Sequence, residues 1–321
     1  MTLKRLLALG LGLGVALSAW QVNAQSKQLS IATGGTGGVY YPLGGGLASI
    51  IGKEIPGTTA TSEVTGGSVD NLKLIGAGSS DIAYSQVDAA WDAINGAGKF
   101  PSKLPVLALA VLYQNHMHLV TVDGTNINKP EDLKGKRVST GAPGSATEVF
   151  AFRVLEAAGL DPDKDIRKER LGVAESVNAI KDRKVDAFFW VGGLPTAAVT
   201  DLSATPNTKV KLIDIAQLAP KMNAKYGPLY TEAVIPKTTY TGMDHDNQNI
   251  SVWNILAANK SMPDDLAYNL TRIVIEKRED LGRVHAEGLN TKAELQSLKR
   301  SGIPFHPGTL KYFADKGIKV E

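Results

Sequence analysis

Cysteine is absent from this chain of 321 residues. Its absence excludes disulfide bonds, and it leaves no thiol that could carry a lipid anchor at the start of an exported protein. The chain is long enough for two ordinary domains and a sizeable core.

An excess of charge of one sign is also missing. The formal net charge is +3, and the sequence contains no basic run. We therefore expect no nucleic-acid partner. With 43% hydrophobic and 21% charged residues, the composition is that of a soluble globular protein.

Histidine is scarce, with five residues in the chain. His116 and His118 are spaced to share one face of a strand, but no third histidine or carboxylate follows nearby to complete a metal site. We expect a structural role for both, and we expect no metal and no cofactor.

Long apolar runs occur only at the N-terminus, where the pattern is that of a secretory signal. Lys4-Arg5 precedes the apolar stretch Leu6 to Ala19, and Val22-Asn-Ala24 resembles a cleavage site. The alternative is a membrane anchor, but the apolar stretch is short for a bilayer span. We predict a signal peptide over residues 1–24, cleavage after Ala24 and a soluble protein in the periplasm.

The main internal feature is a strand, a glycine loop and a helix that occur twice, about 107 residues apart, at residues 29–41 and 137–148. Similar helix and strand patterns follow each copy, at residues 66–84 and 174–189. A helix N-terminus has unpaired N–H groups and partial positive charge, so it binds anions. Two such units predict a cleft with one anion-binding wall in each lobe.

The order of elements predicts an α/β fold of two doubly wound lobes around a cleft. The chain is expected to cross between lobes at residues 116–122 and to return at residues 233–235, which makes a two-crossing hinge. Lobe 1 is then discontinuous, with residues 25–117 and 233–321, and lobe 2 has residues 118–232.

Familiar nucleotide motifs do not fit the first glycine loop, Gly34–Gly38. The dinucleotide spacing G-x-G-x-x-G fails at Tyr40, and no Gly-Lys-Ser/Thr follows for a P-loop. A turn without any ligand is the plain alternative. The second copy of the loop favours ligand binding.

Several other side chains are candidates for the cleft. Ser68 and Ser176 are expected to cap the second helix of each lobe, and Ser68 can contact the ligand as well. Trp190 borders a glycine-rich turn, and Gln86 follows a strand end of the first lobe. Asp81 and Asp186 occupy equivalent positions before strands, which indicates a structural role.

The predicted ligand-binding set therefore combines both glycine loops with these cleft side chains. Its members are Gly35, Thr36, Gly37, Gly38, Val39, Tyr40, Ser68, Gln86, Gly144, Ser145, Thr147, Trp190 and Gly192. No catalytic residue is predicted, because neither serine lies in a G-x-S-x-G elbow and no His–Asp pair is placed beside one.

Four segments, Ile31–Pro42, Thr65–Leu72, Pro143–Glu148 and Asp186–Gly193, are similar to the TAXI family. These proteins are the extracytoplasmic solute receptors of TRAP transporters. The resemblance runs from about residue 28 to the end and implies a type II periplasmic binding-protein fold. It also implies a small organic acid ligand, glutamate-like or 2-oxoglutarate-like, and TRAP permease subunits as partners. Ala146 departs from the glycine that many relatives have there.

Two other functions stay open. The first is an exported hydrolase that uses a cleft serine. The second is a binding protein of the same fold that serves an ABC importer or a sensor kinase. We expect a monomer that is not an enzyme.

Overall fold

Ten strands form a single sheet in the computed structural model, which describes residues 27–320. The order along the sheet is β2-β1-β3-β10-β4-β7-β5-β6, with β8 paired to β4 and β9 to β10. The predicted signal peptide lies outside the described residues. The strands are β1 (Lys27–Ala32), β2 (Thr58–Glu63), β3 (Ile82–Gln86), β4 (Val106–Val122), β5 (Arg137–Ser139), β6 (Arg167–Glu169), β7 (Ala187–Gly192), β8 (Val210–Leu212), β9 (Thr231–Ile235) and β10 (Asn247–Asn259).

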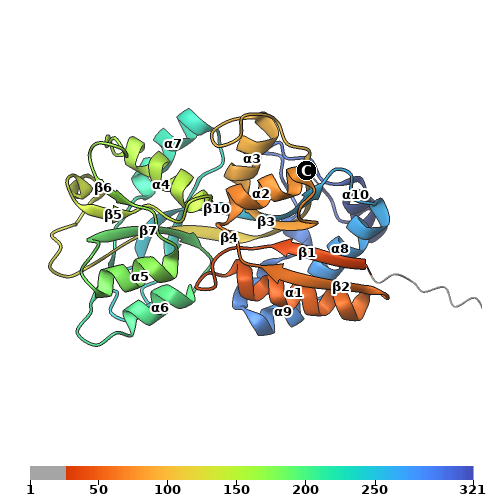
Figure 1. Ribbon diagram of the computed structural model, residues 1–321, viewed down its shortest axis with the longest axis horizontal. Helices are drawn as coiled ribbons and strands as arrows, with labels where there is room; N and C mark the ends of the chain where they lie inside the picture. The colour runs from red at the N-terminus through yellow and green to blue at the C-terminus, as the bar shows by residue number, and fades with distance from the viewer. Residues whose placement is uncertain (1–26, 321) are drawn as a thin grey trace, which may run out of the picture.

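Helices cover both faces of this sheet (Figure 1), as the predicted doubly wound fold requires. We call the half of the molecule that contains β1, β2 and β3 the first half, and the half that contains β5, β6 and β7 the second half. In the first half, α2 and α3 lie on one face of the sheet and α1, α8 and α9 on the other. In the second half, α4 and α7 lie on one face and α5 and α6 on the other. The helices are α1 (Tyr40–Glu54), α2 (Ser68–Ala77), α3 (Val87–Asn95), α4 (Ala146–Ala157), α5 (Val173–Lys181), α6 (Ala197–Ser203), α7 (Ala219–Tyr226), α8 (Asp264–Glu276), α9 (Arg278–Val284) and α10 (Pro307–Lys316), with short 3₁₀ turns η1 (Pro130–Leu133), η2 (Ala216–Leu218), η3 (Ala286–Asn290) and η4 (Ala293–Leu295).

The two predicted repeats correspond in detail. In each, the strand end is held by a threonine whose N–H and hydroxyl both donate to one carbonyl of the neighbouring strand: Thr33 to Glu63 and Thr140 to Glu169. Asp81 and Asp186 also correspond, because each carboxylate accepts a backbone N–H at 2.8 Å from the strand beside it. The structural role predicted for these aspartates is confirmed.

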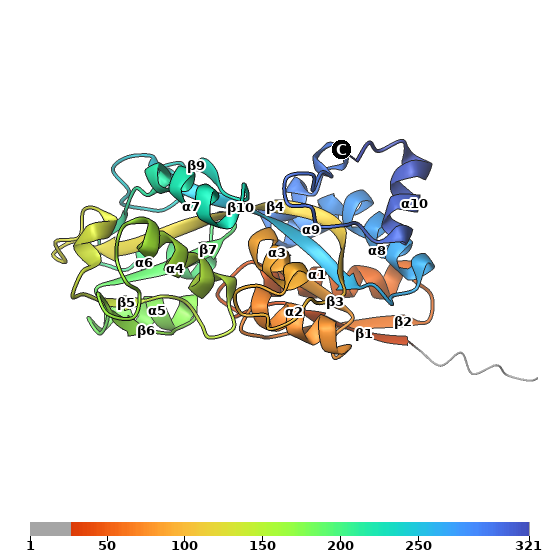
Figure 2. The same ribbon diagram turned by 90° about the horizontal axis from the view of Figure 1, so that it is seen from above.

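Two long strands join the halves (Figure 2). β4 pairs with β10 along its first part and with β7 and β8 along its last part, and His116 lies where these pairings meet. β10 begins beside β9 and ends beside β3. The return crossing therefore runs along β10, and not at residues 233–235 as the sequence predicted. Each segment contains a short apolar run, residues 233–235 in β9 and 255–258 in β10, so the pattern alone does not tell which one crosses.

A hydrophobic core continues from one half to the other. It includes Val87 and Ala90 on α3 and Phe150 and Val154 on α4, all buried in one cluster. β3 is buried at every position, as expected for an inner strand that is covered on both faces. In this structure the halves are thus packed against each other through α3 and α4, and the cleft between them is closed.

None of the described helices is both long and apolar enough to cross a membrane.

Candidate functional site

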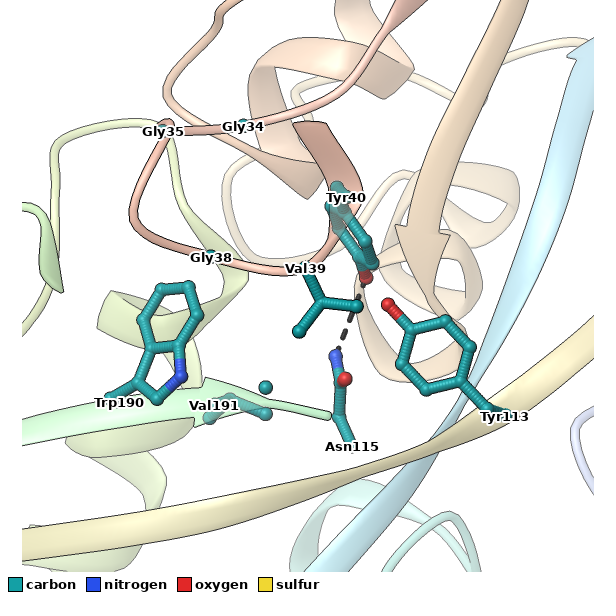
Figure 3. A pocket seen from close by; sticks show the side chains of 10 residues that line it. Gly34, Gly35, Gly38, Val39, Tyr40, Tyr113, Asn115, Trp190 and Val191 are labelled. Carbon is teal, nitrogen blue, oxygen red and sulfur yellow. Dashed lines mark hydrogen bonds between the residues drawn. The ribbon is translucent and has the colours of Figure 1, made fainter. Parts of the chain in front are cut away.

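A small cavity lies where the first glycine loop meets the end of β7 (Figure 3). It encloses about 30 Å³, which is room for about two water molecules. One wall comes from the first half of the molecule, one from the second, and β4 supplies the floor. The lining residues are Gly34, Gly35, Gly38, Val39, Tyr40, Tyr113, Asn115, Trp190, Val191 and Gly192.

The first wall is the N-terminus of α1. Its cap position is Val39, and valine has no acceptor with which to cap the helix. The loop before it turns tightly, with Gly38 N–H donating to the Gly35 carbonyl at 3.1 Å. The N–H groups of Tyr40 and Tyr41 in the first turn of α1 have no partner within the helix, and Pro42 carries no N–H, so this wall can hold an anion with these two donors.

Trp190 forms the opposite wall from the end of β7. Its indole N–H donates to the Thr196 hydroxyl at 2.9 Å, which fixes the ring. The ring lies so close to Gly38 that a Cβ there would stand 2.9 Å from Trp190 Cη2. Glycine at position 38 is therefore required for the two walls to meet.

The floor is a buried cluster of uncharged polar side chains. Asn115 Nδ2 donates to Asn254 Oδ1 at 2.9 Å, and Tyr40 Oη also donates to that oxygen. Asn115 Nδ2 lies 3.4 Å from Tyr40 Oη, the contact drawn in Figure 3. Burial raises the pKa of Tyr40 and of Tyr113, so both keep their protons at neutral pH.

Tyr113, Asn115 and Asn254 are not among the residues predicted from the sequence. Asn254 gave a weak signal, because it lies between Trp253 and Ile255, whereas Asn115 lies between the polar residues Gln114 and His116 and does not stand out. Side chains that face each other across β4 and β10 cannot be matched from the sequence before the register is known.

Six members of the predicted ligand-binding set line the cavity: Gly35, Gly38, Val39, Tyr40, Trp190 and Gly192. Two of the others lie on the same loop but face elsewhere. Thr36 is exposed, and Gly37 packs on α6, where its carbonyl accepts from Ala198 N–H at 3.4 Å.

Ser68 and Gln86 are not lining residues, although Ser68 lies beside the lining residue Tyr40. The Ser68 hydroxyl accepts from Gln86 N–H at 3.2 Å. Ser68 is the first residue of α2, after the cap residue Gly67, and Ser176 lies within α5, where it bonds Ser139 at 2.8 Å. The prediction that these serines cap their helices is wrong, because Gly67, with a φ of +115°, and Gly172 stand at the cap positions.

The second glycine loop is engaged with protein groups. Ser145 caps α4 by accepting from Glu148 N–H at 3.1 Å, and the Thr147 hydroxyl accepts from Val191 N–H at 3.4 Å. The Gly144 carbonyl accepts from Asp70 N–H of α2 at 3.0 Å, which links the two halves. Of the two predicted anion-binding helix ends, α1 faces the cavity and α4 does not.

A second link between the halves is a buried ion cluster on α3 and α4. Arg153 donates to Asp92 at 2.5 Å and to the Tyr230 hydroxyl at 2.7 Å, and Tyr230 donates to Asp88 at 3.0 Å. Burial raises the pKa of both aspartates, and the Arg153 guanidinium opposes that shift. We call Asp88, Asp92, Arg153 and Tyr230 the clasp.

The histidines on β4 have structural partners. His116 Nδ1 lies 3.1 Å from Asn249 Oδ1, and His118 contacts the Tyr240 hydroxyl at 2.9 Å. Among residues 27–320, no three His, Asp or Glu side chains are grouped as metal ligands. In the same part of the chain, no hydrogen bond joins Ser68 or Ser145 to a histidine.

Two α/β halves joined by crossing strands, with a cavity between them, define the fold of the periplasmic binding proteins. The chain belongs to the NMT1-like family, whose model matches residues 31–317.

Solved structures with this fold include the periplasmic binding protein BugD, with 15% identity, coverage of 92% of this chain and 99% of that one, and a TM-score of 0.52. A protein described as an L-cystine ABC transporter from Listeria monocytogenes has 19% identity, coverage of 82% and 96%, and a TM-score of 0.51. A binding component of an ABC phosphonate transporter from Pseudomonas aeruginosa has 12% identity, coverage of 83% and 80%, and a TM-score of 0.51. At these identities, the similarity establishes the fold.

Proposed function

We propose that this protein is an exported, non-enzymatic receptor that binds a small organic acid between its lobes and delivers it to a membrane transporter. The observation that carries the proposal is the cavity itself, where the uncapped end of α1 meets Trp190 from the other half. The sequence predicted lobes of residues 25–117 with 233–321 and residues 118–232, and we move the return from residue 233 to β10, where the strand pairing places the crossing.

The ligand binds through a carboxylate at the first turn of α1. A helix N-terminus stabilises an anion by about 0.3–1 kcal/mol when exposed and more when buried. The second helix end, at α4, is capped by Ser145. The repeat predicted that the N-terminus of α4 would bind a second anion. A second carboxylate, as in a glutamate-like ligand, therefore needs a partner other than α4.

Entry of the ligand requires the lobes to open. Ligand pockets have volumes of about 300–1,000 Å³, whereas the cavity encloses about 30 Å³. The receptor alternates between an open form and a loaded form that closes like the one described here but with its walls far enough apart to hold the ligand, and a transporter distinguishes loaded from empty receptor by its affinity for the different forms.

Two kinds of transporter are candidates. The resemblance to the TAXI family favours a TRAP permease. The Listeria and Pseudomonas proteins belong by description to ABC transporters, and an ABC importer is supported at least as well. Reconstitution of uptake with the permease encoded beside this gene distinguishes them, because ABC transport requires ATP hydrolysis.

Calorimetry on protein that has been unfolded and refolded to remove any carried ligand tests the receptor function. We expect a carboxylate from a panel of small organic acids to bind, and Gly38→Val to weaken its binding at least tenfold, because the added side chain collides with Trp190. Gly45→Ala is the control, since a Cβ at this exposed α1 position meets no atom of residues 27–320 within 4 Å. Absence of binding across the panel, or equal losses in both variants, would refute the proposal.

A further inference from the structure

The amide groups on the cavity floor have one orientation that satisfies their hydrogen bonds. The backbone carbonyl of Tyr113 can only accept, so the group of Asn254 that lies 3.1 Å from it is Nδ2. Asn254 Oδ1 then faces Asn115 and accepts from its Nδ2 at 2.9 Å. It follows that Asn115 turns its Oδ1, a pure acceptor, away from this pair.

Two polar atoms remain unpaired at this point. Among the residues that the structure describes, Asn115 Oδ1 and Tyr113 Oη have no hydrogen-bond partner, although both residues are 1% exposed. Both residues line the cavity, and in Figure 3 the Tyr113 hydroxyl lies beside that of Tyr40, with the Asn115 amide below them. Buried polar groups are nearly always paired, so these atoms indicate a partner that the chain does not provide.

The unpaired atoms differ in what they need. Asn115 Oδ1 requires a donor, whereas the Tyr113 hydroxyl has a proton to give. Glu287 lies near Tyr113, but its oxygens already accept from Leu194 N–H at 2.7 Å and from Asn290 at 2.6 Å. No lining residue carries a formal charge.

We infer that the cavity selects a 2-hydroxy carboxylate, an inference that rests on the proposed function. The ligand hydroxyl donates to Asn115 Oδ1 and accepts from Tyr113 Oη. A hydroxyl does both at once. A keto oxygen only accepts and leaves Asn115 unpaired. An ammonium only donates, so it leaves the Tyr113 proton without an acceptor, and it finds no carboxylate in the lining to balance its charge.

Matched ligands on one carbon skeleton test this inference by calorimetry on the refolded full chain. One series is 2-hydroxyglutarate, 2-oxoglutarate, glutamate and glutarate, and the other is lactate, pyruvate, alanine and propionate. In whichever series binds, we expect the hydroxy acid to bind at least tenfold more tightly than its keto, amino and unsubstituted counterparts, because each of these leaves a buried group unpaired.

A variant of Tyr113 tests whether the cavity floor causes the preference for the hydroxy acid. Tyr113→Phe should weaken binding of the hydroxy acid at least fivefold and leave the affinity for the unsubstituted acid unchanged. Tyr84→Phe is the control, because Tyr84 is buried beside Tyr40 but does not line the cavity.

The possible results separate the two proposals. Tighter binding of the keto or amino acid overturns the hydroxyl inference and leaves the receptor function standing. Equal binding within a series also overturns it, because the unpaired atoms then hold only a water molecule. If no carboxylate of either series binds, the proposed function and this inference both fail.

Discussion

Trp190 links the ligand site to closure at the scale of a single residue. Its ring belongs to the second half of the molecule and touches Gly38 of the first half, so opening must expose it. Trp91 and Trp253 do not line the cavity.

We predict that a binding carboxylate changes the intrinsic fluorescence and that Trp190→Phe removes most of the change. The physical reason is that closure moves the indole from water to the Gly38 contact. Trp253→Phe should leave the change in place. A full signal in the Trp190 variant would contradict this assignment.

His118 is a buried histidine at the crossing strand. Its Nδ1 lies 2.8 Å from the His116 carbonyl, so Nδ1 carries the proton and Nε2 accepts from Tyr240. Burial, and to a lesser extent His116, lowers the pKa of His118 to about 3. The folded protein therefore holds this imidazole neutral.

Stability should consequently fall as the pH is lowered from about 6.5 toward 3, because the unfolded chain binds a proton that the folded chain does not. Burial lowers the pKa of His116 as well, so it contributes in the same direction. We predict that His118→Gln destabilises the protein at pH 8 but flattens the decline in unfolding free energy between pH 6.5 and 3, as measured by urea denaturation.

The exposed His245 supplies the control for this experiment. Asp244 raises the pKa of His245, so its contribution has the opposite sign. In His245→Asn, the unfolding free energy should still decline between pH 6.5 and 3. If the decline in His118→Gln is as steep as in the parent protein, His118 is not its source.

At the scale of elements, the N-terminus of α2 docks on the second glycine loop. Asp70 N–H donates to the Gly144 carbonyl, and a Cβ at Gly144 would stand 2.2 Å from the Asp70 carboxylate. Gly144 has a φ of +78°, and Gly159 has a similar φ of +82° but open space around it. The two glycines differ in whether they touch the other half of the molecule.

We predict that Gly144→Ala weakens carboxylate binding at least fivefold, whereas Gly159→Ala leaves it unchanged. Both variants pay the left-handed backbone cost of about 1–2 kcal/mol, which thermal unfolding will register in each. Only the first also disturbs the docking of α2. Equal affinity in the two variants would mean that the docking does not contribute to closure.

At the scale of the whole molecule, contacts outside the cavity lining hold the halves together. The clasp joins α3 to α4, and a hydrophobic core continues beneath it. Removing one partner of a buried ion pair costs about 3–5 kcal/mol. This cost falls on the closed form, because opening returns the aspartates to water.

We predict that Arg153→Met shifts the unliganded protein toward the open form, with a larger radius of gyration in small-angle scattering. Tyr230→Phe is a milder change in the same cluster and should act in the same direction. Arg137→Met is the matched control, since the Arg137–Asp186 pair at 2.6 Å lies within one half. An unchanged radius in both clasp variants would contradict a role in closure.

Much of the fold was predictable from the sequence because its signals are local. The repeat predicted two strand–loop–helix units, and Thr33 with Thr140 and Asp81 with Asp186 show that the correspondence extends to single hydrogen bonds. The residues that cap the helices were harder to predict. Serine is a good cap in general, but Gly67 and Gly172 hold those positions before α2 and α5.

The sequence by itself determined the α/β class, the two repeated units and the glycine loop that lines the cavity, because alternation, helical period and glycine content act over a few residues. Only the tertiary structure decided that the chain returns along β10, that Asn115 meets Asn254 and Tyr40 on the cavity floor, and that Arg153 joins the halves. These pairings join residues far apart in the chain. They depend on strand register and on the closed packing of two lobes. Neither can be inferred from the pattern of residues within a short segment of the sequence.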